Sequence, residues 1–138
     1  MRVRPGIEVL LDERRVSIAG ARVGAVVHPA SVLPDLRHTA DALLDDGTFH
    51  LAGLWGPQHG ARGEKQDNMV ESDFYRDPDT GLPVYSLYGE TRRPTEESLD
   101  TIDVLLFDLQ DAGTRIYTFI STMAYCMEAC ARLGKRMI

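Results

Sequence analysis

The chain has 138 residues, of which 43% are hydrophobic and 26% charged, with a formal net charge of −6. These values are typical of one globular domain with a hydrophobic core. The acidic balance argues against nucleic acid as a partner, because phosphate binding needs clustered Lys and Arg. No apolar run approaches the roughly 20 residues that span a bilayer, and the N-terminus lacks an apolar signal core. We therefore expect a cytoplasmic protein without membrane contact.

The first half of the chain predicts a strand–helix–strand unit. Residues 6–13 form an amphipathic pattern that indicates a short helix. The compact apolar run at 21–27 indicates a strand buried on both faces. Apolar positions at helical spacing over 35–44 predict a helix, and 49–55 is a second apolar strand.

The second half continues the alternation after a long polar loop over residues 56–82. Strands are predicted over 82–88 and 102–109, with a capped helical turn at 95–99 between them. The chain stops inside a further apparent strand, so we expect residues 1–138 to be a fragment, or a domain whose natural partner domain is missing. Strands alternating with helices predict an α/β, Rossmann-like, three-layer domain with a mostly parallel sheet.

The longest predicted helix spans residues 117–133 and has apolar residues at i, i+3, i+4 and i+7. This spacing predicts that Phe119, Met123 and Met127 face the core. Cys126 and Cys130 lie four residues apart on one face of the helix. A disulfide there would be strained, so we expect two reduced core thiols.

Three polar segments follow predicted strands and are expected to meet at one edge of the sheet, because ligands of open α/β sheets bind beyond the carboxyl ends of the strands. The first begins at His28, the second covers 56–68 and the third covers 110–118. They and the adjoining residues supply the carboxyl groups of Glu64, Asp67, Glu71, Asp108 and Asp111, the imidazole of His59, the guanidinium of Arg115 and the amides of Gln66 and Asn68.

This set of groups suits the cleavage of a sugar. Glycoside hydrolysis needs a proton donor for the departing oxygen, and negative charge or a nucleophile near the anomeric carbon. It also needs hydrogen-bonding groups that hold hydroxyls and an acetamide. Neither G-x-G-x-x-G nor G-x-x-x-x-G-K-[ST] is present, so a nucleotide cofactor has little support. We expect no cofactor and no resident metal.

Three motifs in the same order resemble those of a known family. They are Gly56-Pro57-Gln58-His59-Gly60, the segment TGLPVYSLYG over 80–89, and the segment FDLQDAGTRIYTFISTM over 107–123. The chain is similar over almost its whole length to the exo-β-N-acetylmuramidases, which remove N-acetylmuramic acid from the non-reducing end of peptidoglycan fragments. The resemblance implies a Rossmann-like N-terminal domain, a second domain, and a site in the cleft between them.

The chain departs from the family pattern at Gln58. Family members carry glutamate there, which is a suspected catalytic acid, and glutamine cannot exchange a proton in that role. We therefore predict that Glu64, six residues further on, is the general acid. Asp108 or Asp111 would be the ionised partner, and the substrate acetamide is an alternative nucleophile. His59 is predicted to contact substrate or relay a proton.

The remaining candidates are predicted to bind substrate. Arg115 suits the lactyl carboxylate of muramic acid, because its planar fork matches a carboxylate, although a structural pair with Asp108 fits equally well. Trp55 ends a strand and is expected to pack in the core rather than stack on a sugar. Contacts to hydroxyl or acetamide groups are expected from Gln58, Gln66, Asn68, Tyr88, Tyr117 and Thr118.

Two other functions are compatible with the same residues. The first is a non-catalytic module that binds sugars or muropeptides, which Gln58 favours. The second is a metal-dependent hydrolase that uses His59 with Asp108 and Asp111. The terminal strand and the open cleft also predict a tendency to form homo-oligomers.

Overall fold

The computed structural model describes residues 2–63, 74–113 and 117–138, and shows a six-stranded sheet with helices on both faces. The elements in chain order are α1 (Gly6–Val9), the π-helical segment η1 (Leu10–Arg14), the 3₁₀ segment η2 (Arg15–Ile18), β1 (Arg22–Val26), α2 (Thr39–Leu44), β2 (His50–Gly56), β3 (Tyr75–Arg76), β4 (Pro83–Ser86), α3 (Glu96–Asp100), β5 (Val104–Phe107), α4 (Phe119–Arg132) and β6 (Arg136–Met137).

The strand order is β3-β4-β2-β1-β5-β6. All neighbouring strands are parallel except the short β3, which runs antiparallel to β4. The predicted α/β class and mostly parallel sheet are therefore confirmed. The strands β2, β1 and β5 are adjacent, so their carboxyl ends lie next to one another at one edge of the sheet.

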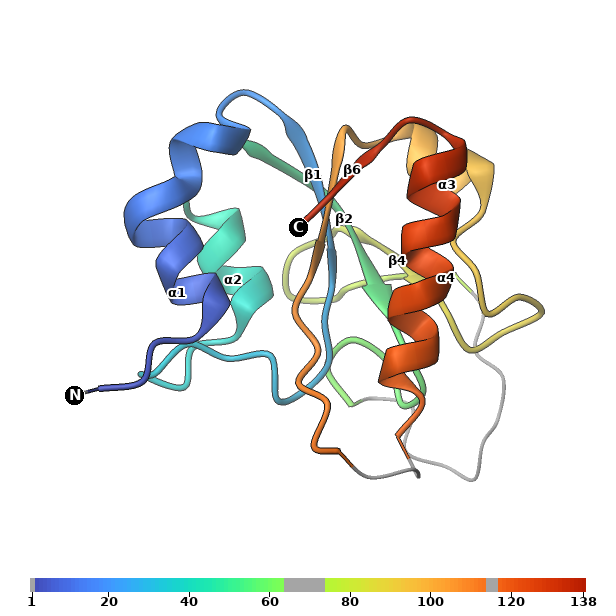
Figure 1. Ribbon diagram of the computed structural model, residues 1–138, viewed down its shortest axis with the longest axis horizontal. Helices are drawn as coiled ribbons and strands as arrows, with labels where there is room; N and C mark the ends of the chain where they lie inside the picture. Colours follow the sequence, from blue (N-terminus) through green and yellow to red (C-terminus); the bar gives the residue numbers. More distant parts are fainter. Residues whose placement is uncertain (1, 64–73, 114–116) are drawn as a thin grey trace.

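Two helical layers cover the sheet, as Figure 1 shows, with α1 and α2 on one face and α3 and α4 on the other. Successive residues of the central strands alternate between two cores. Leu54 packs in the core under α1 and α2, whereas the next residue, Trp55, packs in the core under α3 and α4. In β5, Leu105 packs in the core under α3 and α4, and Leu106 packs in the core under α1 and α2. A strand buried on both faces explains the unbroken apolar runs in the sequence.

Trp55 requires a glycine on the neighbouring strand. A Cβ built on Gly24 of β1 would lie 2.3 Å from an indole carbon of Trp55 and 2.9 Å from the Cδ1 of Ile102. The indole therefore crosses β1 at the one position without a side chain. Trp55 is 0% exposed, which confirms its predicted place in the core.

Replacing Gly24 with alanine is expected to lower the free energy of unfolding by about 2 kcal/mol, the usual cost of overpacking a core. The added methyl group must displace a rigid ring rather than a flexible chain end. Urea denaturation of both proteins would measure the change. Gly47 is a matched control, because a Cβ there meets nothing within 4 Å, and Gly47→Ala should leave stability nearly unchanged. Equal effects at the two positions would contradict the packing argument.

Helix α4 ends as predicted at Gly134, which has a φ of 65°. The amide of Lys135 donates to the carbonyl of Cys130 at 2.8 Å, and that of Gly134 donates to Ala131 at 3.4 Å. This pair of bonds is a Schellman motif, in which glycine adopts the left-handed conformation. Both cysteines are buried and unpaired, as expected.

The predicted core face of α4 is partly wrong. Phe119 is buried, but Met123 is 38% exposed and Met127 is 54% exposed. The face toward the sheet is instead formed by Phe119, Thr122, Cys126, Ala129 and Cys130. The helix carries apolar residues on more than one face, so periodicity alone could not determine which face is buried.

Two other boundaries differ from the sequence prediction. The helix expected over 35–44 begins only at Thr39, because Leu36 has a φ of 68° and an isolated antiparallel bridge joins Val32 to His38. The side chain of His38 then caps the helix by accepting a hydrogen bond from the amide of Ala40. The loop over 56–82, expected to lack any core element, contains β3, which pairs with β4.

Candidate functional site

Asp108 lies directly after β5, at the carboxyl edge of the sheet. Its amide donates to the carbonyl of Val26 at the end of β1, over 3.0 Å. The hydroxyl of Thr39, at the start of α2, donates to Oδ2 of Asp108 at 2.6 Å. The Ser31 hydroxyl donates to the Asp108 carbonyl oxygen. Asp108 is thus held by the end of β1 and by the start of α2, the two elements that flank the 28–38 loop.

Burial raises the pKa of the Asp108 carboxyl above its ordinary value. The hydrogen bond from Thr39 and the nearby imidazoles of His28 and His38 act in the opposite direction but do not cancel the effect. Asp108 forms no ion pair with any residue that the structure describes. No neighbouring cation among the described residues offsets the burial of the ionised carboxylate. A positive charge brought near Asp108 therefore interacts strongly with it.

His28 follows β1 and lies close enough to Asp108 to lower the pKa of that carboxyl when protonated. Its Nδ1 accepts a hydrogen bond from the amide of Ala30 at 2.7 Å. In the neutral imidazole the proton is consequently on Nε2. Burial lowers the pKa of His28, which favours the neutral form. The ring packs on Phe119 at 4.8 Å between centroids, and Phe119 in turn contacts Tyr117 at 5.3 Å.

Three residues of this cluster had no role predicted from the sequence, namely Ser31, His38 and Thr39. His38 Nε2 lies 3.1 Å from the carbonyl oxygen of His28, and its Nδ1 accepts from Ala40, so Nε2 is the donor. Ser31 and Thr39 are polar residues that are fully buried. Nothing in the local sequence predicts that a hydroxyl group in a polar loop is buried, so the sequence contains no signal for these two residues.

His59 lies in a tight turn that follows β2. The amide of Gly60 donates to the carbonyl of Pro57 at 2.9 Å, which closes the turn. His59 itself has a φ of 75°, a left-handed conformation that costs a non-glycine residue about 1 kcal/mol. A Cβ on Gly56 would lie 2.8 Å from the amide nitrogen of Ala61, so the loop folds back closely on the strand end. This geometry presents the imidazole as an exposed group at the carboxyl edge.

Arg62 anchors the far end of this loop. Its Nη2 lies 2.6 Å from Asp41 of α2, and its Nε lies 3.0 Å from Asp77, which is 2% exposed. Thr80 also donates to Asp77 at 2.5 Å. The guanidinium lowers the pKa of both carboxyl groups, and they raise the pKa of Arg62. The loop that carries His59 is thereby tied to α2 and to the turn before β4.

The structure places the other described candidates around the same edge but does not join them into one network. Asp111 is exposed, and its Oδ1 accepts from the amide of Gly113 at 2.8 Å. Thr118 is exposed at the start of α4, and Tyr117 is about half exposed. Tyr88 lies beneath the guanidinium of Arg92, 3.7 Å from its ring centroid, and Gln58 is half-buried beside His59.

Six of the candidate residues named from the sequence lie outside the described residues: Glu64, Gln66, Asp67, Asn68, Glu71 and Arg115. In the parts of the chain that are described, no group of three or more His, Cys, Asp or Glu side chains is arranged to hold a metal ion. The same parts contain no helix that is both long and apolar enough to cross a bilayer.

Comparison with known proteins identifies relatives along almost the whole chain. The curated peptidoglycan β-N-acetylmuramidase NamZ of Bacillus subtilis (strain 168) is 45% identical over 133 residues, which are 96% of this chain and 32% of that protein. The crystal structures of two DUF1343 family proteins from Bacteroides fragilis also match. One has a TM-score of 0.86 and 44% identity, and the other a TM-score of 0.78 and 27% identity.

The chain covers 33% and 34% of those two structures, while 97% and 99% of this chain is matched. It therefore spans about a third of the length of its relatives. Residues 23–138 match the family described as "Exo-beta-N-acetylmuramidase NamZ, N-terminal". The chain belongs to this NamZ family of peptidoglycan glycoside hydrolases, of which it represents the N-terminal part.

Proposed function

We propose that the protein releases N-acetylmuramic acid from the non-reducing end of peptidoglycan fragments by general acid catalysis. Membership of the family supports this class of reaction and substrate. The structural observation that carries the proposal is Asp108, a partly buried carboxyl group without an ion-pair partner among the described residues. It lies at the carboxyl edge, where the loops after β1, β2 and β5 begin.

Asp108 is proposed to stabilise the transition state. Cleavage of a glycosidic bond develops positive charge at the anomeric carbon. A carboxylate that is partly removed from water, and not neutralised by a neighbouring cation, interacts strongly with such a charge. Because the Thr39 hydroxyl and the Val26 carbonyl hold Asp108 in place, little reorganisation is needed when the charge appears.

Glu64 is proposed as the proton donor to the departing oxygen, since the family position for this role carries Gln58. His59, held exposed in its turn by Arg62, would contact the sugar or relay the proton. Arg115 would bind the lactyl carboxylate of the muramic acid. Hydroxyl and acetamide contacts are assigned to Gln58, Gln66, Asn68, Tyr88, Tyr117 and Thr118.

The decisive experiment is incubation of the protein with a chromogenic N-acetylmuramic acid glycoside. We expect release of the chromophore and of N-acetylmuramic acid. In Glu64→Gln the release should fall at least about 100-fold, because general acid catalysis contributes 10²–10⁴ in rate. Asp67→Asn is the control, because it removes one negative charge from the same segment at a residue without an assigned role in the reaction. Activity of Glu64→Gln equal to that of the wild type would show that another group donates the proton.

A second function is favoured by one observation, the glutamine at position 58 where the family carries glutamate. An amide binds a sugar but cannot transfer a proton, so a non-catalytic muropeptide-binding module is the alternative. Binding of the glycoside without release, measured by calorimetry, would support the module. In that case Gln58→Glu would be expected to introduce cleavage.

A further inference from the structure

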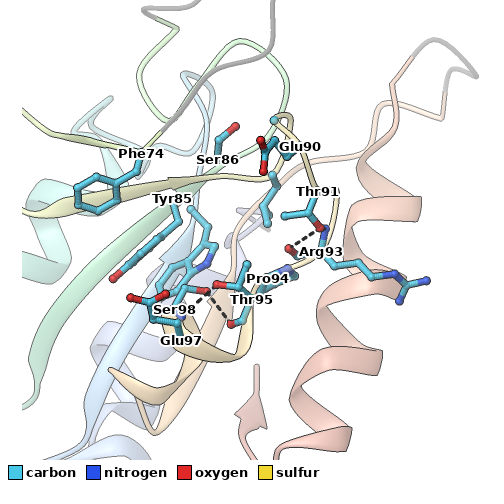
Figure 2. A pocket seen from close by; sticks show the side chains of 13 residues that line it. Phe74, Tyr85, Ser86, Glu90, Thr91, Arg93, Pro94, Thr95, Glu97 and Ser98 are labelled. Carbon is cyan, nitrogen blue, oxygen red and sulfur yellow. Dashed lines mark hydrogen bonds between the residues drawn. The ribbon is translucent and has the colours of Figure 1, made fainter.

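A cavity lies beside the carboxyl end of β4, on the face of the sheet that α3 and α4 cover. It has a volume of about 500 Å³, within the range of small-molecule sites. Figure 2 shows it lined by β4, by the loop that leads into α3, and by the first turn of α3. Of the side chains assigned above to catalysis or to substrate contacts, none that the structure describes lines it.

One wall of the cavity consists of three aromatic rings. Trp55 and Tyr85 are register partners in β2 and β4, and their rings stack at 4.8 Å with an interplanar angle of 29°. Phe74 lies 5.4 Å from Tyr85 and is 55% exposed. Such a wall offers a broad apolar face, and a pyranose ring presents a matching apolar face of C–H groups. The wall therefore fits a flat, partly apolar ligand.

The same wall contains a hydrogen-bond donor that the protein does not use. The indole Nε1 of Trp55 is buried and has no acceptor among the described residues. A buried donor without a partner lowers stability, and native structures rarely retain one. Trp55 has no exposed surface, so a ligand oxygen removes that cost only when a side chain of the wall moves aside and uncovers the donor.

The charged groups of the cavity select the ligand further. Glu90 and Glu97 line it and form no ion pair with any described residue. Arg93 also lines it, but its guanidinium pairs with Glu128 and stacks over the ring of Tyr125. Figure 2 shows the Arg93 side chain extending away from the cavity toward α4. Among the described residues the available charges are therefore negative. Carboxylates accept hydrogen bonds from hydroxyl groups and repel anions.

We propose that this cavity is a binding site for an uncharged N-acetylhexosamine ring, separate from the site that cleaves muramic acid. Tyr85 and Phe74 pack against the apolar face of the sugar, and Glu97 and Glu90 accept hydrogen bonds from its hydroxyls. Trp55 donates to the acetamide oxygen after a side chain of the wall has moved aside, since the indole has no exposed surface. The choice of an amino sugar rests on the proposed function. The site would hold the uncharged sugar of a peptidoglycan strand and exclude the carboxylate of muramic acid.

The chain carries a direct reporter, because Trp55 is its single tryptophan. The protein is titrated with methyl N-acetyl-β-glucosaminide while Trp55 emission is recorded. We expect a saturable change in intensity or wavelength. In Glu97→Gln the dissociation constant should rise roughly tenfold, the effect of weakening one hydrogen bond to a charged group. Glu96→Gln is the matched control, since this neighbour in the same helical turn does not line the cavity.

The proposal would be overturned by emission that does not change at any sugar concentration, or by equal effects of Glu97→Gln and Glu96→Gln. It would also be overturned if N-acetylmuramic acid, or a cation such as tetramethylammonium, gave the tighter response. Hydrolysis of the chromogenic glycoside is measured separately. Saturable binding without hydrolysis would contradict only the proposed function, and hydrolysis without a Trp55 response would contradict only the second site.

Discussion

Asp108→Asn is expected to lower kcat/KM on a muramic acid glycoside by about 100-fold or more, the usual loss when one preorganised electrostatic group is removed. Asparagine keeps the shape and accepts the Thr39 hydrogen bond, so the loss should appear mainly in kcat. Asp111→Asn is the matched control. Asp111 is exposed and, among the described residues, bonds only to its own turn, so we expect a change of a few-fold at most. The reverse order of effects would assign the ionised role to Asp111.

The same substitution should stabilise the fold at neutral pH. Burial raises the pKa of Asp108 in the folded state, so the folded protein binds a proton more tightly than the unfolded chain. The contribution of Asp108 to stability is therefore fully present below the unfolded pKa of about 3.8 and is lost as pH rises through the folded value. Asp108→Asn should melt a few degrees higher at pH 7, and this difference should vanish at low pH. A lower melting temperature at pH 7 would contradict the burial argument.

The pH dependence of activity gives an independent readout of Asp108. If the ionised carboxylate stabilises the transition state, kcat/KM should fall on the acid side through a pKa above the ordinary value of 3.8. The residual activity of Asp108→Asn should lack that acid limb. An unchanged acid limb in the variant would show that it belongs to another group.

Arg62→Met is expected to have the largest effect on stability. Removing one partner of a buried ion pair costs about 3 kcal/mol or more, because the other charge stays buried without compensation. Asp77, which is 2% exposed, would be left in that state. For a chain of 138 residues this corresponds to a fall in Tm of about 10 °C. Activity should fall as well, since the loop that presents His59 loses its anchor.

Two further variants test whether the buried pair is the cause. Arg37→Met removes an arginine that pairs with Asp45 at an exposed site, where such pairs contribute at most about 1 kcal/mol. The double variant Arg62→Met/Asp77→Asn removes both charges and should recover part of the lost stability. A double variant less stable than Arg62→Met alone would show that Asp77 does not depend on this guanidinium.

Much of the fold could be predicted from local patterns. The apolar runs around Val26, Trp55 and Leu105 indicated strands buried on both faces, and Gly134 marked the end of α4. The face that α4 buries could not be predicted, since Met123 and Met127 are as apolar as the residues that replaced them. Ser31, Thr39 and Arg62 were not recognised, because their partners lie 77, 69 and 15 to 21 residues away along the chain.

The sequence by itself determined the alternation of strands and helices, the family motifs and the polar loops that follow the strands, because each depends on residues close together in the chain. Only the tertiary structure decided which of those loops become neighbours, since that follows from the strand order β2-β1-β5. It also decided that Asp108 is partly withdrawn from water without a partner cation among the described residues, and that the indole of Trp55 keeps an unused donor. Burial and pairing are properties of the packed molecule, and no local pattern encodes them.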